Sequence, residues 1–264
     1  MTLVPFVHRL PTAHEIEKLR LILSTFQDGS GMLFVKNQGT LPGWRDFERS
    51  VALVFGGVAQ ESKAIFDVLI PDPNRPGIHY GVSCKVRNLL RDVDRKGRVS
   101  VEVSNSLGKF WDALAEAGLN HQTYTQRPDR VGETILNLVE SWYSPVSQAN
   151  GGNTNLDGSF YLVLQWDRTS KRYQLYQFPL RFPNPGDISW EVTGRRLIGR
   201  DATGVLFEWY GLAGGQLKYY PLVDKAIWTS QRFQLEPLPP NDMRYGILRK
   251  ASEYFPELWK ACLE

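Results

Sequence analysis

The hydrophobic pattern of this chain changes at residues 145–158, a segment rich in Ser, Asn and Gly. Before this segment, some stretches repeat apolar residues at helical spacing and others form short apolar runs, which predicts a mixture of helices and strands. After it, short aromatic and β-branched runs are separated by Gly, Pro, Asp and Asn, a pattern typical of strands joined by turns. We therefore expect an α/β (α+β) fold in two parts, residues 1–150 and a β-rich part at residues 151–264.

Local patterns in the first part predict both helices and strands. Thr12 is a suitable N-cap for the first helix, and the charged residues 91–98 are expected to form a solvated turn. We expect helices over residues 12–26, 42–55, 107–117 and 131–142, and strands over residues 64–70, 80–86 and 99–103.

The second part is predicted to consist mainly of strands, followed by one helix at residues 245–263. Its tryptophans are more often core residues than surfaces for stacking bases. The expected strands cover residues 160–166, 173–178, 196–200, 205–210 and 217–222.

The composition limits the possible locations and partners. Cys84 and Cys262 are the two cysteines and lie far apart, which makes a zinc site or a disulfide framework improbable. No apolar run reaches the ~18 residues of a membrane span, and the N-terminus lacks the features of a signal peptide. We expect a soluble cytoplasmic protein with no membrane partner. A net charge of +3 permits an anionic partner without requiring one.

An acid and a lysine in strand-like settings are the main candidates for chemistry. Asp67 lies between two short apolar runs, and Lys85 ends a run eighteen positions later. Hydrolysis of a phosphodiester requires a metal that activates water and a cation that balances the developing charge. Mg²⁺ prefers oxygen ligands, which Asp67 and the backbone carbonyl of Cys84 can supply. Glu48 on the preceding helix could complete the shell, and Lys85 shares a sheet face with Ser83.

In these residues the chain resembles the PD-(D/E)xK nuclease superfamily, the fold of many type II restriction endonucleases. The resemblance covers residues 40–145 and rests on Glu48 in a helix, Asp67 in a strand and Ser83-Cys84-Lys85 in the next strand. It implies a mixed central sheet flanked by helices, with Asp67 as the main ligand of Mg²⁺ and Lys85 positioning the attacking water. It also implies double-stranded DNA as substrate, a homodimer for a palindromic site, and a possible cognate DNA methyltransferase.

Ser83 departs from the pattern of this superfamily, because it stands where a second acid is expected and cannot supply a carboxylate. Some restriction enzymes of the superfamily have Ser-x-Lys and recruit a glutamate from further along the chain. Glu102 is the first candidate for this role, and Glu61 is a weaker one. If neither replaces the missing acid, the site holds its metal weakly or is inactive.

Each of these residues also has a purely structural interpretation. Asp67 could form a salt bridge with Lys85 or Lys63, because a buried carboxylate needs a partner. Glu48 and Glu102 could face solvent. The Cys84 side chain is more simply a small core residue than a nucleophile.

Several cationic and amide side chains are candidates for contacts with DNA. Asn105 is most simply part of a helix cap, but it could also present its amide to a phosphate. For any single cation, a solvated surface position is the simpler interpretation. The candidates are Lys63, Arg87, Asn105 and Lys109 near the proposed site, and Arg195, Arg196 and Arg200 in the β-rich part.

The expected function is therefore that of a Mg²⁺-dependent, sequence-specific DNA endonuclease similar to type II restriction enzymes. A modification-dependent or repair nuclease is the alternative enzyme. Ser83 leaves open a non-catalytic DNA-binding protein on a decayed nuclease fold. The mild net charge leaves open a β-rich interaction protein with no role on DNA.

Overall fold

The computed structural model describes residues 2–36, 39–60, 65–211, 214–239 and 246–262. Its main feature is a central sheet in which β13, β8, β7, β5, β4 and β3 lie in that order and β14 also pairs with β8. The pair β5–β7 is parallel and the other pairs are antiparallel. The strands are β3 (Val58–Ala59), β4 (Val68–Pro71), β5 (His79–Arg87), β7 (Phe160–Trp166), β8 (Arg172–Pro179), β13 (Trp228–Thr229) and β14 (Phe233–Gln234).

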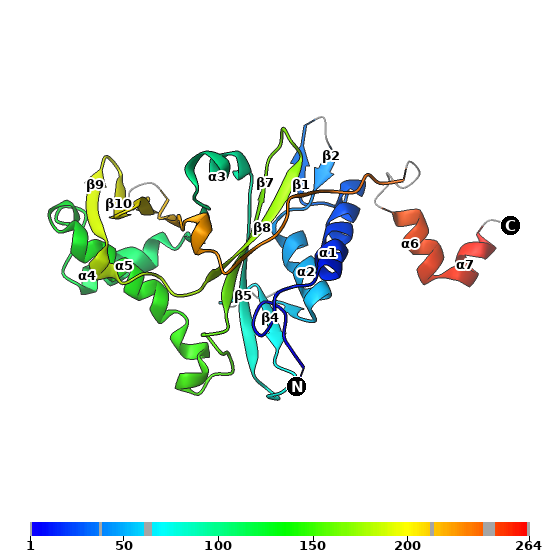
Figure 1. The fold of residues 1–264 in the computed structure, drawn as a ribbon, viewed down its shortest axis with the longest axis horizontal. Coiled ribbons are helices and arrows are strands. Elements are labelled where there is room, and N and C mark those ends of the chain that lie inside the picture. The colour runs from blue at the N-terminus through cyan, green and yellow to red at the C-terminus, as the bar shows by residue number, and fades with distance from the viewer. Residues whose placement is uncertain (1, 37–38, 61–64, 212–213, 240–245, 263–264) are drawn as a thin grey trace.

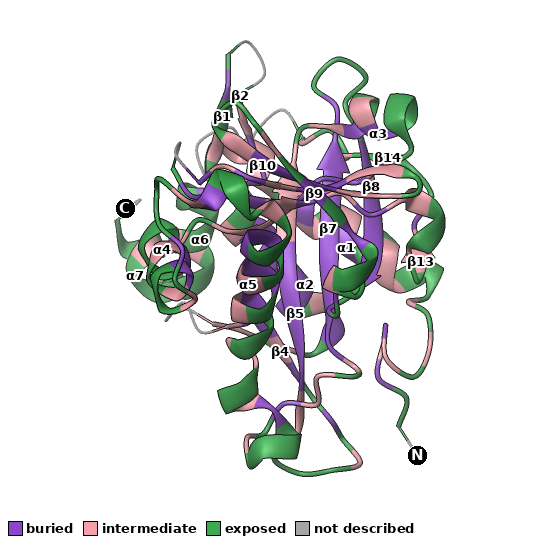
Figure 2. Cartoon of the chain, turned by 90° about the vertical axis from the view of Figure 1, so that its left-hand side faces the viewer, coloured by how far each residue is buried: buried purple, intermediate pink, exposed green. Residues whose placement is uncertain are grey.

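The middle strands are buried because both faces of the sheet are covered (Figures 1 and 2). Every residue of β7 is buried, which accounts for its nearly continuous apolar sequence. Helices α1 (Ala13–Thr25) and α2 (Trp44–Phe55) cover one face, where Leu19 and Phe47 pack against the sheet. Thr12 caps α1 through a capping box with Glu15, as predicted for the helix at residues 12–26.

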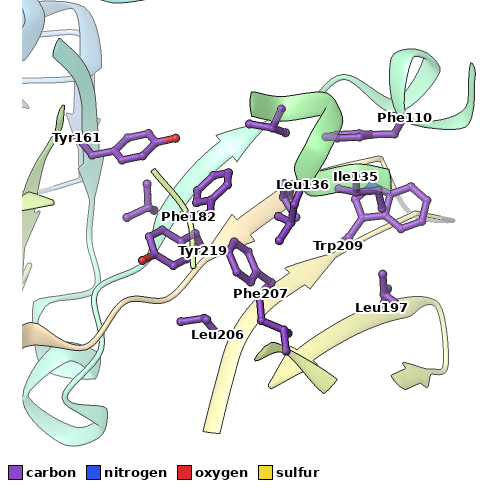
Figure 3. Packing of buried hydrophobic residues seen from close by; sticks show 14 of the residues in the cluster. Phe110, Ile135, Leu136, Tyr161, Phe182, Leu197, Leu206, Phe207, Trp209 and Tyr219 are labelled. Carbon is purple, nitrogen blue, oxygen red and sulfur yellow. The ribbon is translucent and has the colours of Figure 1, made fainter. Parts of the chain in front are cut away.

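The opposite face is covered by α4 (Leu107–Glu116), α5 (Pro128–Ser141) and a second sheet. This sheet is antiparallel, in the order β6, β12, β11, β10, β9. Its aromatic side chains pack against α4 and α5 (Figure 3). Its strands are β6 (Val101–Ser104), β12 (Leu217–Tyr219), β11 (Gly204–Trp209), β10 (Arg196–Asp201) and β9 (Ser189–Thr193).

The fold is mixed α/β (α+β), as predicted, but the boundary at residue 150 does not divide the two sheets. Strand β6 precedes that boundary and belongs to the second sheet, whereas β7 and β8 follow it and belong to the central sheet. The change in sequence pattern therefore marks where β-rich sequence begins, and not where one spatial unit ends.

Some local predictions were wrong in detail. Residues 91–98 lie mostly in a helix, α3 (Leu90–Lys96), whose Leu90 and Val93 are buried. The strand expected at residues 64–70 begins at Val68. The expected closing helix is broken into α6 (Ile247–Tyr254) and α7 (Pro256–Ala261), because Pro256 lacks the N–H that would continue α6.

The remaining elements are short. The pair β1 (Leu33–Val35) and β2 (Gly39–Leu41) forms a small antiparallel sheet. In the described residues, no helix is long and apolar enough to cross a membrane. The 3₁₀ helices lie at Phe26–Asp28, Tyr124–Gln126, Ser144–Val146, Gln148–Asn150, Pro185–Asp187 and Val223–Lys225.

The close contact between α5 and β9 gives a test of the fold. A Cβ atom on Gly132 would lie 2.2 Å from atoms of the Trp190 ring. We expect Gly132→Ala to lower the free energy of unfolding by about 1–3 kcal/mol, although alanine is the better helix former. Urea denaturation measures the change. The control is Gly108→Ala in α4, where a Cβ meets no atom within 4 Å. It should be neutral or slightly stabilising, and equal losses in both variants would contradict this packing.

Candidate active site

The candidate site lies where β4 separates from β5. The Asp67 N–H donates to the Val82 carbonyl at 3.1 Å, and the Asp67 carbonyl accepts from Gln60 N–H at 2.9 Å. On the N-terminal side of Asp67, the described residues do not pair with β5. The backbone groups of β5 that follow Val82 therefore have no strand partner among them on the side of β4. The ring of Phe66 lies directly over Gly81, where a Cβ would come within 2.3 Å of it. This packing holds the residue next to Asp67 in place.

The Asp67 carboxylate takes the position that a continuing strand would occupy. Its Oδ2 accepts the Cys84 N–H at 2.8 Å and lies 3.3 Å from Lys85 Nζ. The Ser83 hydroxyl is 3.4 Å from the same oxygen. The salt bridge that the sequence offered as the structural interpretation of Asp67 is therefore present. Asp67 and Lys85 are 29% and 20% exposed, so the pair can still be reached by solvent and by a ligand.

Glu48 approaches Asp67 from α2 and is 4% exposed, so the expectation that it could face solvent is wrong. Its pKa is raised to about 7, first because burial disfavours the charged form and second because Asp67 is a nearby like charge. Arg45, one turn earlier in α2, places Nη1 3.6 Å from Glu48 Oε2 and opposes this effect. Two carboxyl groups and two cations thus meet at one point.

The backbone of Cys84 also faces this point. In a β-strand the N–H and C=O of one residue project to the same side. The Cys84 N–H donates to the Asp67 carboxylate, so the Cys84 carbonyl also projects toward Asp67. The Cys84 side chain is buried in the apolar cluster beneath α2. Burial raises the pKa of its thiol, which makes it a poor nucleophile at neutral pH.

Glu102 takes part in a different set of contacts. It lies on β6 and forms an ion pair with Arg87. The Asn105 amide also donates to Glu102. The N-cap of α4 is the next residue, Ser106, which makes no side-chain capping hydrogen bond. Within the described ranges, no three His, Cys, Asp or Glu side chains form a group that could hold a metal. Glu102 therefore does not form such a group with Asp67 and Glu48, although all three line the same cleft.

A cleft of about 840 Å³ opens over these residues. Its walls come from α2, β5, β6, the start of α4 and the end of α5. The sequence analysis missed Trp44, Trp142 and Tyr143, which also line it. The spacing of Trp44 four residues before Glu48 could have indicated the first of these. The predicted site residues that line the cleft are Glu48, Asp67, Ser83, Cys84, Lys85, Arg87, Glu102, Asn105 and Lys109.

The predicted DNA-binding arginines of the β-rich part lie elsewhere. Arg196 pairs with Glu208 at 3.2 Å, and Arg200 pairs with Glu191 at 3.0 Å. Arg195 lies in the turn between β9 and β10. These three arginines are absent from the described lining of the cleft. Lys63 and Glu61 fall outside the described residues.

The oxygen atoms around Asp67 and Glu48 are of the kind that bind Mg²⁺ in proteins. Glu48 and Asp67 offer two carboxylates, and Cys84 offers a backbone carbonyl. Mg²⁺ is commonly held by one or two carboxylates, with water and phosphate oxygens completing its shell. The pKa of Glu48 is raised first by burial and second by the like charge of Asp67, and a divalent cation between the two carboxyl groups would offset the second of these effects.

The chain was compared with family models, curated proteins and solved structures, and nothing in any of the three comparisons matches it.

The raised pKa of Glu48 predicts a pH-dependent loss of stability when Mg²⁺ is absent. The unfolded chain releases the Glu48 proton near its ordinary pKa of 4.5, but the folded chain keeps it until pH is about 7. Stability therefore falls as pH rises between these values. In EDTA, we expect Glu48→Gln to match the wild type at pH 4.5 and to exceed it by about 1–3 kcal/mol above pH 7.

Thermal unfolding over this pH range measures the difference. Glu116→Gln, which changes an exposed carboxyl group of α4, is the matched control and should show no comparable gain. A constant difference between Glu48→Gln and the wild type at all pH values would contradict the burial of a titrating carboxyl group beside Asp67.

Proposed function

We propose that this chain is a Mg²⁺-dependent endodeoxyribonuclease that hydrolyses phosphodiester bonds of double-stranded DNA, similar to type II restriction enzymes. One observation carries the proposal: Glu48, Asp67 and Lys85 meet where β4 leaves β5, inside a cleft that also contains cationic side chains. Glu48 in a helix and Lys85 in a strand agree with the pattern in which the chain resembles the PD-(D/E)xK superfamily, whereas Asp67, expected within a strand, directly precedes β4.

Each residue has a role that its surroundings support. A bound Mg²⁺ ion supplies Lewis acidity and lowers the pKa of water. Asp67 and Glu48 would hold the ion through carboxylate oxygens, and Cys84 would hold it through its carbonyl. Lys85 Nζ, now 3.3 Å from Asp67, carries the charge needed to orient the attacking water and to stabilise negative charge on the phosphate. Ser83 donates to Asp67 and helps to orient its carboxylate.

Arg87 and Lys109 are the candidates for contacts with the DNA backbone, because both line the cleft, and Arg87 would first have to release Glu102. In proteins that bind nucleic acids, such cations mainly position the substrate and make binding dependent on salt. Arg196 and Arg200 would contact DNA only by exchanging their present acidic partners for phosphates or base edges.

One feature favours a second candidate, a DNA-binding protein without catalytic activity. Ser83 supplies no carboxylate, and Glu102 is held by Arg87 and Asn105. For Glu102 to become a ligand, its ion pair with Arg87 must first break. A modification-dependent or repair nuclease would retain the same site and differ only in what the rest of the chain recognises.

We also propose a location, an oligomeric state and a partner for the enzyme. A cytoplasmic location is consistent with the use of Cys84 as a buried free thiol. Cleavage of both strands at a palindromic site would require a homodimer, because the described part of each chain carries one such site. A cognate DNA methyltransferase would then protect the host's own sites.

Purified protein should cut unmodified plasmid or phage DNA into discrete fragments with Mg²⁺ and leave it intact with EDTA. We expect Asp67→Asn and Lys85→Ala each to lower the rate by at least about 100-fold, because one removes a ligand charge and the other removes the balancing cation. Gel analysis of the products measures cleavage, and filter binding in EDTA measures affinity separately.

Asp112→Asn, which changes an exposed acid of α4, serves as the control and should cut at the wild-type rate. Intact DNA in every Mg²⁺ lane, together with salt-dependent binding, would reject the nuclease and support the non-catalytic protein. If neither cleavage nor binding occurs, both the nuclease and the non-catalytic DNA-binding protein are rejected. The remaining hypothesis is then a β-rich interaction protein with no role on DNA.

A further inference from the structure

Two tryptophans stand on different walls of the cleft that contains Asp67 and Glu48. Trp44 begins α2, and Trp142 directly follows α5. A cation covers each ring: the Arg45 guanidinium lies 4.9 Å from the Trp44 centroid, and Lys109 Nζ lies 5.7 Å from that of Trp142. The cleft thus pairs an aromatic surface with a positive charge on both walls.

Packing within the fold does not account for the position of Trp44. Its side chain is 45% exposed, and it belongs to neither of the two apolar clusters that form the core of the described chain. The first position of a helix does not call for a large aromatic residue, since small polar and acidic residues and proline are favoured there. Trp142 is half-buried and packs against Phe110 at 5.7 Å, which leaves part of the indole in the cleft.

Both tryptophans are linked to the carboxyl groups by short chains of contacts. Trp44 precedes Glu48 by one helical turn, so the two lie on the same face of α2. Trp142 is followed by Tyr143, whose ring stacks on Phe66 at 5.5 Å, and Phe66 directly precedes Asp67. A nucleic-acid strand that contacts either indole ring therefore passes close to the proposed metal ligands.

This combination is the one that proteins use to hold unpaired nucleic-acid strands. Bases stack on aromatic rings regardless of sequence, and cations beside the rings contact the phosphates. In a duplex the base faces are already stacked on one another and are not available to the protein. A cleft of about 840 Å³ is in the range that takes a ligand of the size of a drug molecule, which suits one or two nucleotides and not a whole duplex.

We propose that this cleft binds an unpaired strand of DNA, with bases stacked on Trp44 and Trp142. The inference rests on the proposed function and sharpens its substrate: the strand that is cut is single-stranded at the site, in a gap, a flap or a locally opened duplex. An uninterrupted duplex then enters the cleft only where it opens locally, so cutting of plasmid or phage DNA requires local opening at the site.

The test measures binding without cleavage. A fluorescein-labelled 12-nucleotide single strand and a duplex of the same sequence are titrated with the full chain in EDTA, and fluorescence anisotropy gives both dissociation constants. The single strand should bind at least tenfold more tightly. Trp44→Ala should weaken single-strand binding by about 5- to 150-fold, the range that corresponds to one stacked base. Trp44→Phe should retain most of the affinity, since it keeps an aromatic face.

Two further variants guard against unfolding and non-specific effects. Trp142→Leu keeps an apolar contact with Phe110 but removes the stacking surface, and it should also weaken single-strand binding; circular dichroism verifies its fold. Leu53→Ala changes a residue of α2 that is 68% exposed and is not part of the described cleft wall, and it should have no effect.

Equal or tighter binding of the duplex, or unchanged single-strand affinity in Trp44→Ala, would overturn the inference. Its failure is separable from that of the nuclease, because the binding assay contains no metal. Mg²⁺-dependent cutting of intact duplex with no strand preference rejects the stacking site and keeps the nuclease. A clear strand preference that depends on Trp44 without any cutting in Mg²⁺ keeps the stacking site and rejects the nuclease.

Discussion

The parallel pairing of β5 with β7 is the interaction on which the rest of the structure depends. The two strands pair from Val82 with Phe160 to Arg87 with Gln165, and both are buried in the middle of the central sheet (Figure 2). A parallel pair requires a long crossover, and here the crossover contains β6, α4 and α5. It therefore supplies one wall of the cleft and the strand on which the second sheet is built.

The candidate site forms at the N-terminal end of β4, where the pairing of β4 with β5 ends. An unpaired backbone N–H in a partly buried position needs an acceptor, and Asp67 supplies one to Cys84. That contact fixes a carboxylate at the sheet edge, where Glu48 reaches it from α2. Burial and like charge together raise the pKa of Glu48, which is the type of perturbation that accompanies functional sites.

Local sequence patterns were sufficient to predict elements that satisfy one simple rule. The strand at residues 160–166 agrees with β7 (Phe160–Trp166), because a buried central strand is apolar throughout. The Thr12 cap was also found, because capping depends on neighbours in the chain. In contrast, α3 was missed, since its charged residues conceal the two side chains, Leu90 and Val93, that it buries.

For the site, the sequence by itself determined the residue types that can serve phosphodiester chemistry, with Asp67, Lys85 and Glu48 in recognisable local settings. The tertiary structure decided which of them meet. It brought Glu48 to Asp67, paired Glu102 with Arg87 instead, and placed Trp44 in the same cleft. The physical reason is that hydrophobic periodicity and capping depend on residues a few positions apart. These contacts depend instead on how α2 packs against the central sheet and on how the long crossover folds back over it.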